Sequence, residues 1–216
     1  TPFLCSLNFL VMSHPRLSSV PMLFDKNYNM LYSVENIRQR MLEGEMMQLT
    51  REDWIKAGLH QLADEGIHKV RIETLARILN ISKGSFYHHF RDHQELLDAM
   101  FNYWEMVATK RIIHSMEQED SSLEELFTIS FSSDKKIEIG IYTWAKYNQV
   151  VAKRLVDIEE QRIRCIAHLY QKKGSDELEA IERARLAYLT YIGWMTRFTE
   201  NPNFTIGKML ELLLKI

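Results

Sequence analysis

The sequence predicts an all-α protein, and three observations lead to that fold class. No proline lies between Pro21 and Pro202. From residue 49 onward, apolar side chains recur at the spacing of one face of a helix. Strict alternation persists only in 137–144, where a lone strand would have no partner, so we expect a buried helix. With 216 residues, 46% hydrophobic and 26% charged, the chain can bury a sizeable core.

Composition and charge exclude several classes of protein. The two cysteines, Cys5 and Cys165, cannot form a disulfide framework, so we expect a reducing, cytoplasmic location. The longest apolar runs are far shorter than the roughly 18 residues of a membrane span, so we expect no membrane partner. The formal net charge of −2 excludes binding to nucleic acid through bulk charge and leaves only a local binding surface.

The first 46 residues differ from the rest. Three of the four prolines lie there, and no periodic pattern runs through 1–32, although 33–47 could form a short helix. The codons of Glu43-Gly44-Glu45 can form a purine-rich ribosome-binding sequence just before Met46-Met47. We therefore expect residues 1–46 to be either a translated leader or a disordered N-terminal extension.

Capping residues indicate where the next helices begin and end. Thr50 opens the first helix and Gly66 is its expected left-handed stop. The second helix ends at Asn80, a residue that tolerates the left-handed conformation. Asp92, followed three residues later by Glu95, opens a long fourth helix.

The third helix is only about two turns long, and its exposed residues are too polar for a core. It is expected at 83–89 behind a Ser82 cap, and with the preceding helix it matches a helix-turn-helix. Glycine lets a backbone approach a duplex, while cationic, hydroxyl and imidazole groups contact phosphates and base edges. The candidate DNA contacts, in this helix and around it, are Thr50, Arg51, Arg71, Lys83, Gly84, Ser85, Tyr87, His88 and His93.

The charge of this region is nearly balanced. Residues 49–94 contain seven Lys or Arg and six Asp or Glu. For DNA binding, the acidic side chains must therefore face away from the duplex.

One string of residues is highly specific. Ile81-Ser82-Lys83-Gly84-Ser85-Phe86-Tyr87-His88-His89-Phe90, with Leu62-Ala63-Asp64-Glu65-Gly66 before it and Glu95-Leu96-Leu97 after it, resembles the N-terminal domain of the TetR/AcrR family of one-component transcriptional regulators. The resemblance implies DNA contacts at Thr50, Arg51, Lys83, Gly84, Ser85, Tyr87 and His88. Three positions depart from the family pattern. Arg71 stands where many members have a capping Thr, and Asn80 stands in place of the commoner turn Gly. His93 replaces a Lys that usually contacts phosphate.

The resemblance also implies that the later helices enclose a pocket for a small-molecule inducer and form a homodimer. Trp144, Tyr147 and Tyr188 are the candidate ligand-binding residues, since each joins an apolar body to a polar tip. Small and apolar side chains on the last two helices predict the dimer interface, and packing within one subunit is the alternative. The interface candidates are Ala184, Ala187, Tyr191, Leu210 and Leu213.

Other chemistry finds little support. His88 and His93 lie on different helices with no cysteine nearby, so we expect no metal site, and no cofactor is implied. No nucleophile–base or paired-carboxylate arrangement stands out, which argues against an enzyme with catalytic residues. The charged run in 157–164 is typical of a solvated helix face.

These observations predict a helix-turn-helix DNA-binding domain at 47–95 and a ligand-sensing and dimerisation domain, a helical bundle, at 96–216. The predicted function is a ligand-responsive repressor that binds a palindromic double-stranded DNA operator as a dimer. The alternative is a helical ligand-binding or enzymatic protein that retains the helix-turn-helix only as scaffold.

Overall fold

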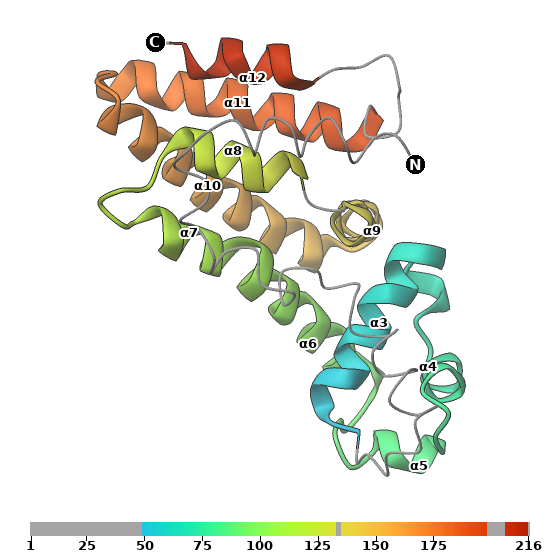
Figure 1. Cartoon of the computed structure of the whole chain (residues 1–216). Helices are drawn as coiled ribbons and strands as arrows, with labels where there is room; N and C mark the ends of the chain where they lie inside the picture. The colour runs from blue at the N-terminus through green and yellow to red at the C-terminus, as the bar shows by residue number, and fades with distance from the viewer. Residues whose placement is uncertain (1–48, 133–134, 198–205, 216) are drawn as a thin grey trace.

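The computed structural model describes residues 49–132, 135–197 and 206–215, and the helix expected at 33–47 lies outside them. Every regular element within these ranges is a helix, which confirms the all-α prediction (Figure 1). The elements are α3 (Arg51–Glu65), η3 (Ile67–Lys69), α4 (Ile72–Ile78), α5 (Lys83–Phe86), α6 (His93–Glu105), the π-helical turn η4 (Met106–Lys110), α7 (Arg111–Met116), α8 (Leu123–Ser132), α9 (Lys136–Ala145), α10 (Gln149–Lys172), α11 (Glu177–Arg197) and α12 (Ile206–Leu214).

The predicted caps set the ends of the N-terminal helices. Thr50 and Asp53 form a reciprocal capping box at the start of α3. The chain leaves α3 at Gly66 with φ of +86° and turns after α4 at Asn80 with φ of +52°, as predicted. The Asp92 carboxylate accepts a hydrogen bond of 2.9 Å from the Glu95 N–H at the start of α6.

The third helix is shorter than predicted. It spans Lys83–Phe86 rather than 83–89, and Ser82 precedes it without making a side-chain cap. Beyond Phe86 the backbone continues in turns, with the Phe90 N–H donating to the Phe86 carbonyl at 3.0 Å. An uncapped start and a glycine at its second position explain why the helix stays short.

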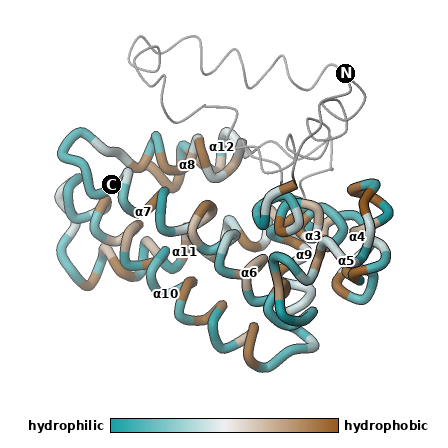
Figure 2. The backbone as a smooth tube through the Cα atoms, turned by 90° about the horizontal axis from the view of Figure 1, so that it is seen from below, coloured by the Kyte–Doolittle hydropathy of each residue, from teal (hydrophilic) through white to brown (hydrophobic). Residues whose placement is uncertain are grey.

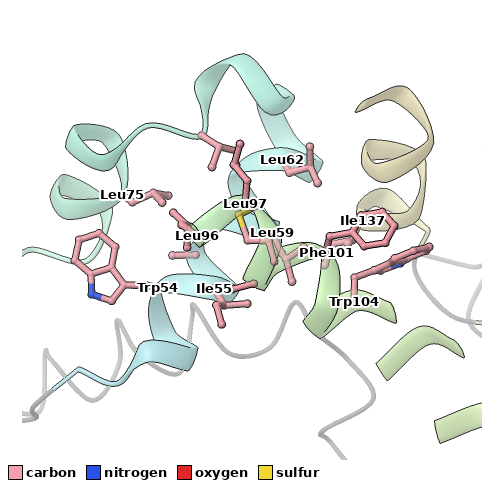
Figure 3. Close-up of a cluster of buried hydrophobic side chains, with 14 of the residues drawn as sticks. Trp54, Ile55, Leu59, Leu62, Leu75, Leu96, Leu97, Phe101, Trp104 and Ile137 are labelled. Atoms are coloured by element: carbon pink, nitrogen blue, oxygen red, sulfur yellow. The ribbon is translucent and has the colours of Figure 1, made fainter. Parts of the chain in front are cut away.

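One hydrophobic core joins the N-terminal helices to part of the bundle. It contains Trp54, Leu59, Phe86 and Trp104, and it extends into α9 and the first half of α10 (Figure 3). The domain boundary expected at residue 95 falls within α6, whose buried residues from Leu96 to Trp104 all belong to this core. The N-terminal helices are thus packed directly onto the bundle.

A second core lies among α8, α10 and α11. Ala184 and Ala187 are buried in it, as is Tyr191, whose ring packs edge-on against Phe131 at 5.6 Å. The alanine stripe lets α11 approach α10 closely. This is the packing within one subunit that the sequence left as the alternative to a dimer interface. These three residues face their own subunit, which corrects their assignment to the dimer interface. Leu210 and Leu213 are only partly buried against the same core.

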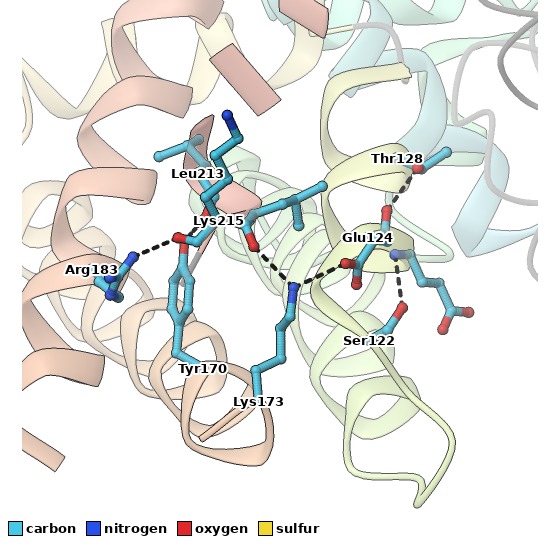
Figure 4. Close-up of polar contacts among 10 residues, drawn as sticks. Ser122, Glu124, Thr128, Tyr170, Lys173, Arg183, Leu213 and Lys215 are labelled. Carbon is cyan, nitrogen blue, oxygen red and sulfur yellow. Dashed lines mark hydrogen bonds and ion pairs between the residues drawn. The ribbon is translucent and has the colours of Figure 1, made fainter. Parts of the chain in front are cut away.

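Three polar side chains hold the end of α12 against the bundle. Tyr170 donates to the Leu213 carbonyl at 2.7 Å, Lys173 to the Leu214 carbonyl at 3.0 Å, and Arg183 to the Lys215 carbonyl at 2.8 Å (Figure 4). The last carbonyls of a helix have no partner within it, so these donors satisfy them.

The helices form an elongated molecule. The short helices α4 and α5 lie at one end, α8 and α12 at the other, and α9 lies beside α3 between them (Figures 1 and 2). No helix in the described part of the chain is long and apolar enough to cross a membrane.

Candidate nucleic-acid interface

The short helix α5 is held in place by one aromatic side chain. Phe86 is fully buried, and its ring meets Trp54 of α3 edge-on at 5.3 Å and stacks on Phe90 at 5.2 Å. Four residues cannot form a stable isolated helix. Packing on α3 therefore fixes the position of α5.

The opposite side of α5 is exposed. Tyr87 has 62% of its surface exposed and packs its ring edge-on against Phe86, while Lys83, Gly84 and His88 are also exposed. A Cβ added at Gly84 would come no closer than 3.6 Å to any neighbour, the Ser82 hydroxyl oxygen. The surface at Gly84 is therefore open, and a duplex can approach the backbone there.

Lys83 pairs with an acidic residue of the preceding helix. Its Nζ lies 2.7 Å from Oε1 of Glu73, and both side chains are exposed. The hydrogen bond and charge of Lys83 hold the pKa of Glu73 below its ordinary value. The expectation that acidic residues face away from the surface is therefore wrong for Glu73.

A second carboxylate organises two arginines beside α5. Glu95 accepts hydrogen bonds from the Arg91 N–H at 2.9 Å, from the Arg91 side chain at 3.2 Å and from Arg51 at 3.3 Å. These contacts hold the pKa of Glu95 below its ordinary value. The Arg51 guanidinium also lies over the Phe90 ring at 4.6 Å, so both cations are fixed before any ligand arrives.

The remaining candidates lie around these groups. Thr50 is exposed at the start of α3. Arg71 starts α4 without capping it, and its Nε donates to the His68 carbonyl at 3.1 Å. His93 is half-buried, and its Nε2 donates to the Val70 carbonyl at 2.6 Å, which ties α6 to the start of α4.

The structure does not bring the three ligand-binding candidates together. Trp144 lies in the first core, with its ring edge-on to Phe101 at 6.2 Å, and Tyr188 lies in the second core. Tyr147 is 84% exposed at the end of α9. Of the three, only Tyr188 joins a buried polar network, since its hydroxyl lies 2.7 Å from the hydroxyl of Tyr142.

An ion pair that the sequence pattern did not predict lies close enough to these tyrosines to interact with them electrostatically. Arg162 of α10 and Glu138 of α9 lie 2.5 Å apart, with side chains 12% and 10% exposed. Burial opposes both charges, but Arg162 and Lys135 hold the pKa of Glu138 below its ordinary value, and Glu138 raises that of Arg162. Arg162 belongs to the charged run expected at the surface, so that expectation is wrong for this residue.

Other reactive groups do not form a site. In the described part of the chain, no group of three or more His, Cys, Asp or Glu could hold a metal ion. Burial raises the pKa of the Cys165 thiol to about 11, which disfavours the reactive thiolate.

Residues 55–100 match the model of a family described as bacterial regulatory proteins, tetR family. The N-terminal helices of the chain are therefore similar to the DNA-binding domain of TetR-family regulators. The matched range contains α4, α5 and the exposed Lys83-Gly84-Ser85-Phe86-Tyr87-His88 segment.

Solved structures share the fold over most of the chain. GusR from Salmonella enterica has a TM-score of 0.59 and 21% identity, covering 77% of this chain and 95% of that chain. A TetR-like transcriptional regulator from Rhodococcus sp. RHA1 has a TM-score of 0.58 and 16% identity, covering 78% of this chain and 94% of that chain. A comparison with curated proteins gave no match.

Proposed function

We propose that this chain is a TetR-family repressor that binds a palindromic operator as a homodimer and releases it when a small molecule binds the bundle. The single observation that carries the DNA-binding part is the anchored α5. Phe86 fixes the helix from below, and Lys83, Gly84 and Tyr87 form an exposed surface above. A recognition helix needs this combination to enter a major groove in one orientation.

The base contacts and the phosphate contacts of this surface differ by residue. Ser85 and His88 have the hydrogen-bonding groups for base edges. Lys83, Tyr87, Arg51 and Thr50 have donors suited to phosphate oxygens, and their contacts give affinity without reading sequence. Arg71 and His93 stay candidates for phosphate contact, although each already donates to a backbone carbonyl.

An exposed apolar face supports the dimer. Leu186 and Leu189 of α11 are 60% and 68% exposed, and Leu178 of α11 and Leu212 of α12 are also exposed. Water-exposed leucines on the two neighbouring last helices favour burial against a second copy, and a two-fold axis would pair the same face of each subunit. In this proposal the interface consists of these leucines together with the partly buried Leu210 and Leu213.

The buried polar network supports a ligand response. Tyr142 donates to Glu159 at 3.0 Å and contacts Tyr188, so polar groups from α9, α10 and α11 meet inside the bundle. A small molecule with hydrogen-bonding groups can exchange for such contacts, and a differential affinity of about 1–3 kcal/mol between two states is the usual size of the coupling.

Selection of binding sites from random duplex DNA tests the proposed function. The full chain is expected to enrich two inverted half-sites whose centres lie about one helical turn, or a multiple of it, apart. Enrichment of a single half-site would contradict the dimer. No enrichment at low salt would favour the alternative in which the helix-turn-helix is only a scaffold.

A further inference from the structure

The helix that leaves the DNA-binding domain contains an irregular turn. α6, η4 and α7 follow one another without a break, and the turn Met106–Lys110 is π-helical, closed by a hydrogen bond from the Arg111 N–H to the Met106 carbonyl. Such turns are rare and occur frequently at functional sites. Thr109 of this turn is buried.

Arg162 of α10 contacts this turn directly. Its Nε donates to the Thr109 hydroxyl at 3.0 Å and its Nη2 to the Ala108 carbonyl at 3.2 Å. Its Nη1 donates to Glu138 of α9 at 2.5 Å, and the guanidinium lies 5.3 Å from the centre of the Trp104 ring in α6. One planar cation therefore connects α10 with α6, the π-helical turn and α9.

Stability alone does not explain this buried pair. The cost of removing two charges from water offsets much of their attraction, and apolar residues of similar size are often at least as stabilising. The planar guanidinium of an arginine nevertheless fixes the relative orientation of its partners, because its N–H groups lie in one plane and donate to acceptors on different sides. The hydrogen bonds of Arg162 thus fix the relative orientation of the surrounding helices, which an apolar contact would not do.

Two of the elements that Arg162 joins, α6 and α9, pack on α3. Ile137 and Ile141 of α9 lie in the same core as α3, and a Cβ on Gly140 would lie 3.0 Å from Cγ of Leu62 in α3. α6 packs on α3 within the same core, near Leu59 (Figure 3). α3 in turn holds α5 through Trp54 and Phe86.

We propose that Arg162 is a positioning residue for DNA binding. By fixing the π-helical turn and α9 together, it sets the angle at which the DNA-binding domain leaves the bundle. In a dimer this angle determines the spacing of the two α5 helices, so a change of a few degrees mismatches them with successive major grooves. Arg162 itself contacts no DNA.

The experiment compares three variants of the full chain. Arg162→Lys keeps the charge opposite Glu138 but lacks the fork that reaches Thr109 and Ala108. The double variant Arg162→Met with Glu138→Leu removes both charges and fills the space with apolar groups. No unpaired buried charge is then left to unfold the protein. Arg164→Lys, in an exposed pair with Glu160 on the same helix, is the matched control.

Three quantities are measured: affinity for the selected operator, thermal unfolding temperature, and hydrogen exchange of amides 106–110. We expect Arg162→Lys and the double variant to bind the operator about tenfold more weakly, within the range typical of coupling between sites. The salt slope should stay unchanged because the phosphate contacts remain, and the amides should exchange faster. Arg164→Lys should match the wild type in all three quantities.

Two results would overturn the proposal. One is a double variant that is as stable as the wild type and binds the operator with wild-type affinity. The other is unchanged exchange at 106–110 in Arg162→Lys. If the wild type itself binds no operator, the proposed function fails, and the exchange measurement alone still decides whether Arg162 holds the turn.

Discussion

Lys83, the first residue of α5, forms an ion pair with Glu73 of α4, with Nζ and Oε1 2.7 Å apart. A duplex must compete with Glu73 for this cation. The carboxylate also lies where it would repel a phosphate held by Lys83. If Lys83 contacts phosphate as proposed, Glu73 therefore weakens that contact.

Glu73→Gln should tighten DNA binding about two- to fivefold, because it removes the competing charge from an exposed pair whose strength is modest. The increase should be similar on operator and unrelated DNA. Fluorescence anisotropy at low salt measures it. Glu65→Gln, which affects an exposed pair with Lys69 at the C-terminal end of α3, is the control and should bind as the wild type does. Weaker binding by Glu73→Gln would show that Lys83 needs Glu73 for its position.

Tyr87→Phe keeps the ring that packs on Phe86 and removes only the hydroxyl. We expect it to weaken binding to all sequences by a similar factor of about 3–10, since one phosphate hydrogen bond is lost. Ser85→Ala and His88→Ala should instead change which half-site is preferred. Competition binding with a set of single-base operator variants distinguishes the two patterns. Uniform losses for all three variants would rule out base readout by α5.

Gly140→Ala should destabilise the protein by about 1–2 kcal/mol, because the added methyl group would lie 3.0 Å from Cγ of Leu62 and 3.2 Å from its carbonyl oxygen. Gly193→Ala is the matched change on α11, where the methyl group meets nothing within 4 Å, and it should be neutral or stabilising by up to about 1 kcal/mol. Urea unfolding measures both. Equal effects would mean that α9 does not pack closely on α3.

Glu138→Gln should cost about 3 kcal/mol at neutral pH, because it leaves the buried Arg162 charge uncompensated. The pKa of Glu138 in the folded state lies below the ordinary 4.5. The ionised Glu138 side chain therefore contributes to stability above pH 4.5, and this contribution is lost as the pH falls through the lower pKa of the folded state. The wild type should lose stability below pH 4.5 more steeply than Glu138→Gln. Glu160→Gln, in an exposed pair, should follow the wild type throughout in the same unfolding series.

Leu186→Asp combined with Leu189→Asp should dissociate the proposed dimer, because two charges would enter an apolar interface. Sedimentation measures the mass, and operator affinity should fall with it. Val156→Asp, at an exposed position of α10, is the control and should remain a dimer. An unchanged mass for the double variant would place the interface elsewhere.

Local signals in the sequence predicted the helix-turn-helix well. Thr50, Gly66, Asn80 and Asp92 act through hydrogen bonds and backbone angles within a few residues, so their roles can be predicted from neighbouring letters. The exposed surface of α5 followed in the same way, because its residues are too polar for a core. Helix length was overestimated where no cap forms, at Ser82.

Contacts between distant residues could not be predicted in this way. The pairing of Glu73 with Lys83 depends on how α4 and α5 cross, and that of Glu95 with Arg51 joins residues 44 positions apart. Arg162 did carry a signal: it lies four residues from Ile158 and from Ile166, both buried, and so shares their face of α10. The charged neighbours at 157–164 obscured it. The alanine stripe of α11 fits either a second copy or α10, and only the fold distinguishes these.

Fluorescence anisotropy of the full chain with the DNA upstream of its own gene, against unrelated DNA of equal length over a salt series, tests the central claim most directly. Tighter binding to its own DNA is predicted, with log affinity falling against log salt by about 0.9 for each phosphate contacted. Absence of binding to either DNA at low salt would contradict the assignment of α5 as a recognition helix.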